Sequence, residues 1–385
     1  MAKRKNGEGS YGKRTINGTE YFYYQDPNKH VTYAKTSKEL QEKLKKKKAE
    51  QQIPVGENIK ATLKEYCEEW LKQVAKRDIT QRTYDDYESI IKNRIGNYAI
   101  ADVELRSLSV NMINNYLDQL AGKYSRGSID KVWTVLRQVI NYGMEEDDIP
   151  KMNLNKIRLP QEREVAVKKK EIPCPTPSDI EELYQESLRK GKGGKYYGDG
   201  AKVIVFIMYS GLRISEAIGL RWKYVAKDLS SIKVAESTVR VKVRDKSGES
   251  NGQYQSLQKD PKTVNGIREV PLPDRACEIL KYFNQIPHKE DDFVFLTANK
   301  TPFGKRAVER TLESMLNHSK CECKEYTPHT LRHAYGSILI QRGVPVATVS
   351  KLLGHGSVDV TTRVYYHLLK DETAEQIKNV FDGEK

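Results

Sequence analysis

The 385-residue sequence predicts a multidomain α+β protein. We expect an N-terminal three-stranded sheet plus a helix, then a helical domain, then a mixed, mainly helical domain with a small antiparallel sheet. Three observations support this. The length exceeds what one hydrophobic core usually organises. The apolar pattern changes along the chain from alternating to helical to mixed. Five prolines between residues 150 and 177 interrupt the periodic pattern. The predicted divisions are 1–56, 57–160, a linker at 161–175, and 176–385.

The charge of the chain is basic and unevenly distributed. The formal net charge is +14, and residues 1–56 hold 13 Lys or Arg against six Asp or Glu, a surplus of +7. A clustered basic surplus suits a polyanion, because each neutralised phosphate releases condensed counterions. A solubilising surface is the alternative interpretation. The amphipathic stretches favour a folded protein over a disordered one, even though only 38% of the residues are hydrophobic.

Neither a membrane span nor a disulfide framework is predicted. No apolar run approaches the roughly 18 residues that a span requires, and no apolar signal core follows the N-terminus, so we expect a cytoplasmic protein. The five cysteines are an odd number without framework spacing, which fits a reducing compartment. Cys321 and Cys323 lie near His318, but two close thiols without a second pair give too few ligands for zinc. No metal site is expected.

The first segment predicts a small sheet and a helix. Asn17-Gly18 supplies the two positive-φ positions of a type I′ turn between runs rich in Tyr and Thr, and so predicts a hairpin. A third strand follows in HVTYAK. Thr36 and Glu39 then form a capping box for a helix through Lys48.

This N-terminal module is interpreted as a DNA-binding domain whose sheet enters the major groove. Alternate residues of a strand must face a core, so sheet packing is an equal alternative for each tyrosine. The candidate contacts are Lys13, Arg14, Tyr21 and Tyr23.

The second region has helical periodicity. Apolar residues from Leu63 to Val74 repeat at the spacing of one helix face, behind a capping box at Thr62 and Glu65. Similar patterns run through TQRTYDDYESIIKNRI, SLSVNMINNYLDQL and SIDKVWTVLRQVINYGM. Four helices make a compact domain, and their apolar stripes are interpreted as its core.

The third region opens with Thr176 before Pro177, which predicts a helix start, and contains a β segment around residues 232–272. Two of its segments carry candidate polar residues. In YSGLRISEAIGLRW, Arg213 lies at a helix start and Glu216 one turn later. In DPKTVNGIREVPL, Lys262 lies in an expected hairpin whose turn signal is Asn265-Gly266.

Two further segments lie nearer the C-terminus. In TPHTLRHAYGS, Thr327 is expected as the N-cap and Pro328 as the first helical residue, so His329 and Arg332 project from one helix face. The segment KLLGHGSVDVTTRVYYHLL brings His355 and, ten residues on, Tyr365. Each segment alone is a weak signal, whereas their order and joint presence are informative.

Together these segments resemble the tyrosine recombinases. The matching motifs are GLRxSE, KTxxGxRxVPL, HxLRH, and LGH followed by TTxxYxH, within about residues 176–370. Upstream, the sheet-plus-helix module and the four-helix domain resemble the arm-binding and core-binding domains of integrases from phages and conjugative transposons. The three-domain order is most similar to conjugative-transposon integrases.

The resemblance implies roles for the candidate residues in cutting a phosphodiester. Two arginines would bind the non-bridging oxygens, a lysine would protonate the leaving 5′ oxygen, and a tyrosine would attack phosphorus. One histidine would take the tyrosine proton, a second would hydrogen-bond the phosphate, and Glu216 would orient the first arginine. A phosphotyrosine conserves the bond energy, so no ATP, metal or other cofactor is expected. The implied catalytic residues are Arg213, Lys262, His329, Arg332, His355 and Tyr365.

Two positions stay open. Lys259 lies three residues before Lys262 and would be the acid if the strand register slips. Tyr366 adjoins Tyr365, although the TTxxYxH frame selects Tyr365. The tail LLKDETAEQIKNVF predicts an amphipathic helix, which either packs on its own domain or docks on a neighbouring subunit.

The predicted function is therefore a site-specific DNA recombinase that integrates and excises a mobile element through a 3′-phosphotyrosine intermediate. The expected partners are double-stranded DNA, three further copies of the chain in a tetramer on DNA, and an excision factor. A type IB topoisomerase is the alternative that keeps the chemistry. A non-catalytic DNA-binding regulator on the same scaffold is the alternative from another class.

Overall fold

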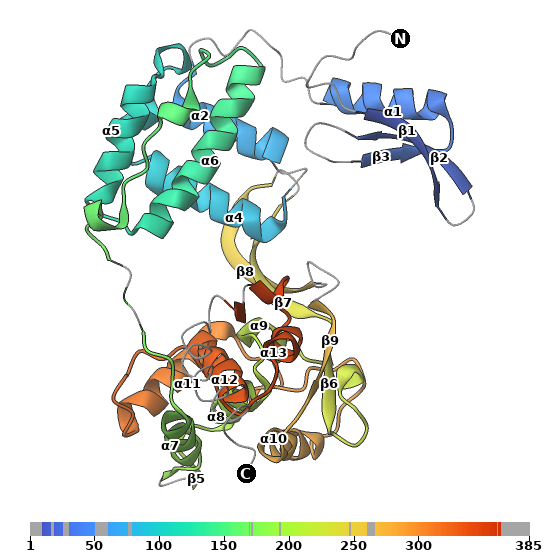
Figure 1. Ribbon diagram of the computed structural model, residues 1–385, viewed down its shortest axis with the longest axis vertical. Helices are drawn as coiled ribbons and strands as arrows, with labels where there is room; N and C mark the ends of the chain where they lie inside the picture. Colours follow the sequence, from blue (N-terminus) through green and yellow to red (C-terminus); the bar gives the residue numbers. More distant parts are fainter. Residues whose placement is uncertain are drawn as a thin grey trace, which may run out of the picture. The chain divides into compact units, whose positions relative to one another are not determined.

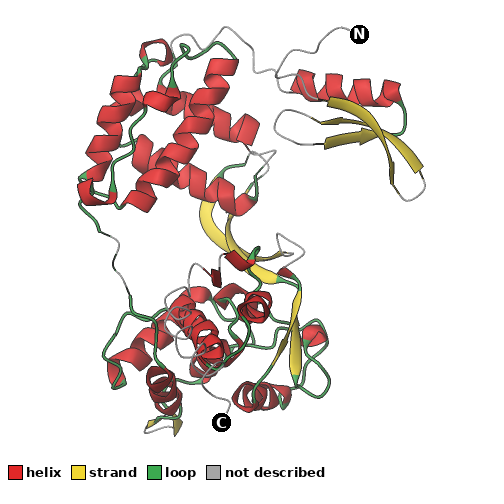
Figure 2. Ribbon diagram, in the orientation of Figure 1, coloured by secondary structure: helices red, strands yellow, loops and turns green. Residues whose placement is uncertain are grey.

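The computed structural model divides the chain into two compact units, Met1–Lys168 and Lys169–Lys385. Helices and small antiparallel sheets build it, as Figure 2 shows, so the predicted α+β fold class is confirmed. The finer division into three domains and a linker stays a prediction. The described residues are 10–16, 19–25, 31–50, 61–75, 79–168, 170, 172–191, 194–245, 248–259, 266–359 and 361–362.

The N-terminal module is the expected three-stranded sheet followed by a helix (Figure 1). In its antiparallel hairpin Ile16 pairs with Thr19, which confirms the predicted two-residue connection, although Asn17 and Gly18 themselves lie outside the described residues. Thr36 accepts a hydrogen bond from the Glu39 amide, but the Glu39 carboxylate accepts from the amide of Lys35 instead of Thr36. The elements are β1 (Ser10–Ile16), β2 (Thr19–Gln25), β3 (Val31–Ala34) and α1 (Ser37–Glu50).

Four predicted helices form the helical part of the first unit. The capping box at its start is confirmed, since the Thr62 amide donates to Glu65 at 2.9 Å while Thr62 Oγ1 accepts from the Glu65 amide. The first two helices each continue into a π-helical turn, Leu71–Ala75 and Ile91–Ile95. The helices are α2 (Leu63–Trp70), α4 (Gln81–Ile90), α5 (Val110–Ala121) and α6 (Arg126–Glu145).

The apolar stripes of these helices form one buried core, as the sequence predicts. Leu63, Ile113 and Leu136 are fully buried in it, and Trp70 is nearly so. Val165 joins the same core, and the amide of Ala166 donates to the carbonyl of Ala121 at 2.7 Å. The first residues of the predicted linker therefore pack on the helical unit.

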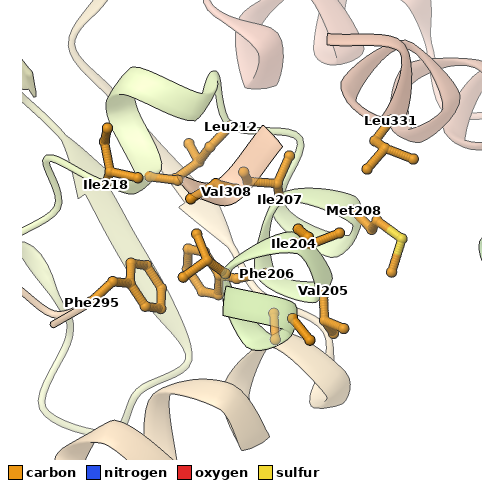
Figure 3. Packing of buried hydrophobic residues seen from close by; sticks show 14 of the residues in the cluster. Ile204, Val205, Phe206, Ile207, Met208, Leu212, Ile218, Phe295, Val308 and Leu331 are labelled. Atoms are coloured by element: carbon orange, nitrogen blue, oxygen red, sulfur yellow. The ribbon is translucent and has the colours of Figure 1, made fainter. Parts of the chain in front are cut away.

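The second unit is built around α8 (Asp199–Ser210), whose side chains from Ala201 to Met208 are almost all buried (Figure 3). The helices that pack on α8 make one apolar core, to which Phe206 and Phe295 contribute ring contacts with centroids 5.0 Å apart. The helices that surround α8 are α7 (Pro177–Ser187), α9 (Ile214–Ala217), α10 (Asp274–Asn284), α11 (Lys305–His318) and α12 (Pro328–Gln341). α13 (Val346–Leu353) packs on α12 through a smaller apolar cluster of its own.

The strands of the second unit correct one prediction. β7 (Ser237–Arg244) pairs with β8 (Ser250–Lys259), and β6 (Ser231–Val234) pairs with β9 (Arg268–Pro271). The hairpin expected around Asn265-Gly266 is therefore wrong, because the strands on its two sides pair with different partners. The small ladder β4 (Lys190–Gly191) and β5 (Gly194–Lys195) completes the described strands.

Candidate active site

Arg213 and Glu216 lie at the start of α9, as the sequence predicts. α8 ends at Ser210 and is followed by the capping residue Gly211, whose φ of 64° is left-handed and where a Cβ would collide with the ring of Tyr335. Two residues later, Arg213 is the N-cap of α9, and its amide donates to Glu216 at 2.9 Å. Arg213 Nη1 donates to the same carboxylate at 2.7 Å, so the two side chains of the GLRxSE segment fix each other.

Arg332 reaches the same carboxylate from α12. Thr327 caps this helix and Pro328 is its first residue, both as predicted. The Arg332 side chain is only 2% exposed, and its Nη1 lies 3.7 Å from Glu216. Nη1 also donates to the carbonyl of Gly211 at 2.7 Å, which ties α12 to the turn before Arg213.

A third arginine on Glu216, Arg268, was missed by the sequence reasoning. Its Nη2 and Nη1 donate to the two carboxylate oxygens of Glu216 at 2.8 and 3.2 Å. The side chain is 2% exposed. Arg268 is the arginine of the KTxxGxRxVPL motif, so its signal was present, but a buried partner 52 residues away could not be assigned from sequence.

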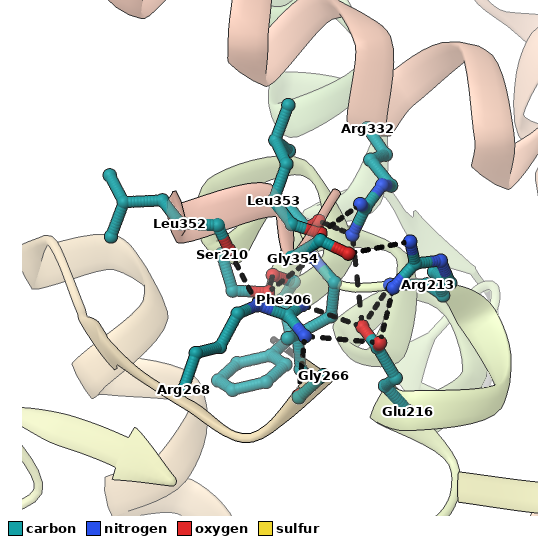
Figure 4. A network of polar contacts seen from close by, with 12 residues as sticks. Phe206, Ser210, Arg213, Glu216, Gly266, Arg268, Arg332, Leu352, Leu353 and Gly354 are labelled. Carbon is teal, nitrogen blue, oxygen red and sulfur yellow. Dashed lines mark hydrogen bonds and ion pairs between the residues drawn. The ribbon is translucent and has the colours of Figure 1, made fainter. Parts of the chain in front are cut away.

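The three arginines also bind the C-terminal end of α13, as Figure 4 shows. Nε of Arg268 donates to Leu352 O at 2.6 Å, and Nη2 of Arg213 donates to Gly354 O at 3.1 Å. Arg332 donates to Leu353 O between them. The last carbonyls of a helix lack intrahelical partners and carry its negative dipole end, so cations are favoured there.

The pKa of Glu216 is lowered to about 2. Burial raises the pKa of this carboxyl, but the hydrogen bonds and charge of Arg268, followed by the charge of Arg213, outweigh burial. The carboxylate is therefore charged at neutral pH and holds the arginines as ion pairs. Removing it would leave two buried guanidiniums without their shared anion.

Two predicted histidines lie within the field of these arginines. Burial, followed by the charges of Arg332 and Arg213, lowers the pKa of His355 to about 4 and also lowers the pKa of His329. Both are therefore neutral at pH 7 in the free protein. Nδ1 of His355 lies 2.7 Å from Oγ1 of Thr361, a fully buried residue of the TTxxYxH segment. This bond fixes the start of the segment that carries the predicted nucleophile.

His333 is a further histidine of this cluster that the sequence reasoning did not single out. It lies one turn after His329 on α12, and the two ring centroids are 4.4 Å apart. Burial, with the charges of His329 and Arg332, lowers its pKa to about 4. The cluster thus combines fixed positive charge with neutral imidazoles.

The structure does not test the remaining catalytic predictions. Lys262, Tyr365 and Tyr366 lie outside the described residues, as does the side chain of Lys259. The tail LLKDETAEQIKNVF also lies outside them. Among the site residues that the sequence predicts, the structure brings five together, namely Arg213, Glu216, His329, Arg332 and His355.

The four candidate DNA contacts of the N-terminal module are divided between the two faces of its sheet. Residues paired across antiparallel strands project to the same side. Arg14 pairs with Tyr21, whereas Lys13 pairs with Phe22 and its Nζ lies 4.8 Å from that ring. Phe22 in turn pairs with buried Ala34, on the side that α1 covers. By alternation, Tyr23 shares the face of Arg14 and Tyr21.

Among the described residues, no group of three or more His, Cys, Asp or Glu side chains is arranged to hold a metal ion. His318 instead places Nδ1 2.7 Å from the carbonyl of Ser314, and Cys321 is buried against Asp179. None of the described helices combines the length and the apolar character of a membrane-spanning helix.

A buried carboxylate that holds three arginines beside neutral histidines, in a unit preceded by a separate helical core, agrees with the site-specific recombinase that the sequence motifs predict. A profile of the phage integrase family matches residues 176–372, more than half of the chain. The chain belongs to the phage integrase family. A second profile, described as the phage integrase N-terminal SAM-like domain, matches residues 62–121. Neither the topoisomerase nor the non-catalytic alternative is favoured.

Similar proteins agree with this assignment. The chain is 26% identical to a tyrosine recombinase XerC-like protein of Caldanaerobacter subterraneus subsp. tengcongensis, over 99% of each chain. In fold it is similar to the Tn1549 transposon integrase solved with circular intermediate DNA, with a TM-score of 0.64 and 19% identity over 78% of this chain and 94% of that one. A lambda integrase tetramer bound to a Holliday junction has a TM-score of 0.55 and 16% identity, over 90% and 95%.

Proposed function

We propose that the protein integrates and excises a mobile genetic element by cutting and rejoining DNA through a covalent bond to Tyr365. The observation that carries this proposal is the convergence of Arg213 and Arg332 on one carboxylate beside His329 and His355. Such an array suits a pentacoordinate phosphate, whose negative charge builds on the non-bridging oxygens.

The proposed reaction exchanges one phosphoester for another. The Tyr365 oxygen attacks phosphorus, the bond from phosphorus to the 5′ oxygen breaks, and the 3′-phosphotyrosine holds one DNA end. A 5′ hydroxyl of the partner strand then attacks the phosphotyrosine and releases the tyrosine. Since one P–O bond forms for each that breaks, no external energy source is required.

The arginines are suited to bind the phosphate. Arg213 is about two-fifths exposed, and within the described part of the chain its side chain makes two hydrogen bonds, which engage two of its five N–H donors. Its remaining donors are therefore able to meet a phosphate oxygen. Arg332 is buried and held at a fixed position by Gly211, so it would contribute charge at little reorganisation cost.

The proton transfers are assigned to the other predicted residues. The lowered pKa of His329 keeps its imidazole neutral at pH 7, as a base for the Tyr365 proton requires. Lys262 would give a proton to the leaving 5′ oxygen. His355, held by Thr361, would donate a hydrogen bond to the phosphate.

The active assembly is proposed to be a tetramer on two paired DNA sites, in the cytoplasm, with an excision factor setting the direction. The lambda integrase tetramer on a Holliday junction supports the assembly by similarity of fold. The tail after Asp371 would dock on a neighbouring protomer. Unchanged assembly and cleavage after its deletion would contradict this exchange.

Covalent trapping tests the proposed function. A nicked, labelled duplex from the element end is incubated with the full chain, and a denaturing gel reports any protein-DNA adduct. We expect an adduct with the wild-type chain and with Tyr366→Phe, and none with Tyr365→Phe. An adduct that survives in Tyr365→Phe would move the nucleophile to Tyr366. No adduct on a duplex that is demonstrably bound would overturn the proposal.

A further inference from the structure

Arg268 occupies the centre of the cluster without facing solvent. Its three nitrogens are all engaged: Nη1 and Nη2 bind Glu216, and Nε binds Leu352 O on α13. The side chain is 2% exposed, so a DNA phosphate has no direct access to it. A charge buried this completely is costly unless every donor is paired, and here the pairs join two separate helices.

We propose that Arg268 is a positioning residue for DNA cleavage. It holds the Glu216 carboxylate at a fixed distance from the end of α13, so that Arg213 and His355 meet the same phosphate. The inference rests on the proposed function, since it concerns the same reaction. The proposed role of Arg268 is to position other side chains, because Arg268 itself would touch neither the phosphate nor the nucleophile.

The shape of the guanidinium explains why an arginine is required. Its fork binds both oxygens of Glu216 while Nε points along another edge to Leu352 O, so one rigid plane fixes the distance between α9 and α13. A lysine ammonium is a single point donor on a flexible stem. It would keep the charge but could not span both partners.

The turn that leads to His355 is built closely around Arg268. Gly354 has a φ of 62°, and a Cβ placed there would lie 2.7 Å from Nη1 of Arg268. Glycine therefore serves both the left-handed backbone and the close approach. The next residue is His355, so a shift of the guanidinium would be transmitted to the histidine through one peptide unit.

The other end of Arg268 is anchored in the sheet. Arg268 is the first residue of β9 and pairs with Val234 of β6, and its Nη1 also donates to Gly266 O at 3.3 Å. The backbone of Arg268 is therefore fixed by a strand ladder, while its side chain fixes two helices. This arrangement is expected of a residue that fixes the positions of other side chains in the site.

The test compares variants of the full chain on the nicked duplex used for trapping. Arg268→Lys keeps the charge and removes the fork. Arg268→Met removes both the fork and the charge, while the Glu216 carboxylate keeps its two other arginines. The control is Arg275→Lys, because Arg275 also pairs with a carboxylate, Glu181, at 2.6 Å, but outside the cluster. Each adduct rate is divided by the folded fraction, measured from thermal unfolding.

Both cluster variants should bind the duplex with the wild-type Kd and form adduct on the order of 100-fold more slowly per folded molecule, as expected for a misplacement near 1 Å. The Arg275→Lys control should match the wild type. A wild-type rate per folded molecule in Arg268→Lys would overturn the inference, and so would a loss confined to DNA affinity.

A second substrate separates positioning of the phosphate-binding groups from assistance to the leaving group. Replacing the bridging 5′ oxygen with sulfur gives a thiolate leaving group that needs no general acid. Because Arg268 acts through Arg213 and His355, its variants should stay slow on this substrate, by about the same factor of 100. Restoration of the wild-type rate by sulfur would overturn the inference. Failure of the wild-type chain to form any adduct would instead reject the proposed function.

Discussion

Two basic regions of this molecule differ in how far their cationic side chains are exposed to solvent. In the N-terminal module Lys13 is 54% exposed and pairs at 3.0 Å with Glu20, which is 58% exposed. In the cluster around Glu216, Arg268 and Arg332 are 2% exposed and are held by a carboxylate and by helix carbonyls. The same charge is solvated in one region and fixed in the other.

The difference indicates two kinds of contribution to DNA recognition. An exposed cation contributes affinity by releasing counterions, and its effect is weakened by salt. A buried cation that is held by ion pairs and hydrogen bonds is already ordered, so it contributes geometry to a transition state. Loss of a cation should therefore be mild and dependent on salt in the module, but severe and independent of salt in the cluster.

The largest expected effect is on the stability of the second unit. Glu216→Ala leaves Arg268 and Arg332 buried without their shared carboxylate, which should lower the free energy of unfolding by about 3–5 kcal/mol. Hydrogen exchange measured by mass spectrometry on peptides of 200–355 would report it. The control is Glu269→Ala, next to Arg268 but exposed, for which a change within about 0.5 kcal/mol is expected. Equal effects of the two variants would contradict the central place of Glu216.

The next effect is on the chemistry. Arg213→Ala removes a donor to the developing phosphate charge and should slow adduct formation by about 100- to 1000-fold. The comparison should be made at two salt concentrations, because a geometric effect persists when salt rises. If the slower adduct formation of Arg213→Ala disappeared at low salt, Arg213 would instead contribute DNA affinity, as the exposed cations of the N-terminal module do.

The pH dependence of stability is expected to be intermediate in size. The pKa values of His333 and His355 are lowered to about 4 in the fold, whereas an unfolded histidine titrates near 6.5. Between these values the unfolded state binds more protons, so stability should fall as the pH falls from 6.5 to 4, by on the order of 1–3 kcal/mol for each histidine. His333→Gln should reduce this fall. An unchanged pH profile in that variant would contradict the assignment.

The smallest effect is expected in the N-terminal module. Arg14→Ala removes a cation from the sheet face that carries Tyr21 and Tyr23, and should reduce the slope of log affinity against log salt by about 0.9 for each lost phosphate contact. Lys13→Ala is the matched control on the opposite face. Titration of a duplex with the full chain at several salt concentrations measures both slopes. A larger change for Lys13 would show that the other face meets DNA.

Local signals predicted the elements well. The capping box at Thr62, the helix start at Thr176-Pro177 and the Thr327-Pro328 start of α12 depend on residues within three positions of each other, so the sequence predicts them directly. The hairpin expected at Asn265-Gly266 was wrong, because its turn signal was local while β8 and β9 find their partners elsewhere. Strand pairing depends on contacts that a turn dipeptide does not specify.

The sequence by itself determined the fold class, the order of the motifs and five of the residues that meet in the site, but it did not single out Arg268 or His333. Only the tertiary structure decided how those residues are held. Arg268 reaches Glu216 across 52 residues and Leu352 across 84, and no periodicity encodes such distances. The physical reason is that a buried ion pair is stable only when packing brings every donor to an acceptor, which is a property of the folded chain as a whole.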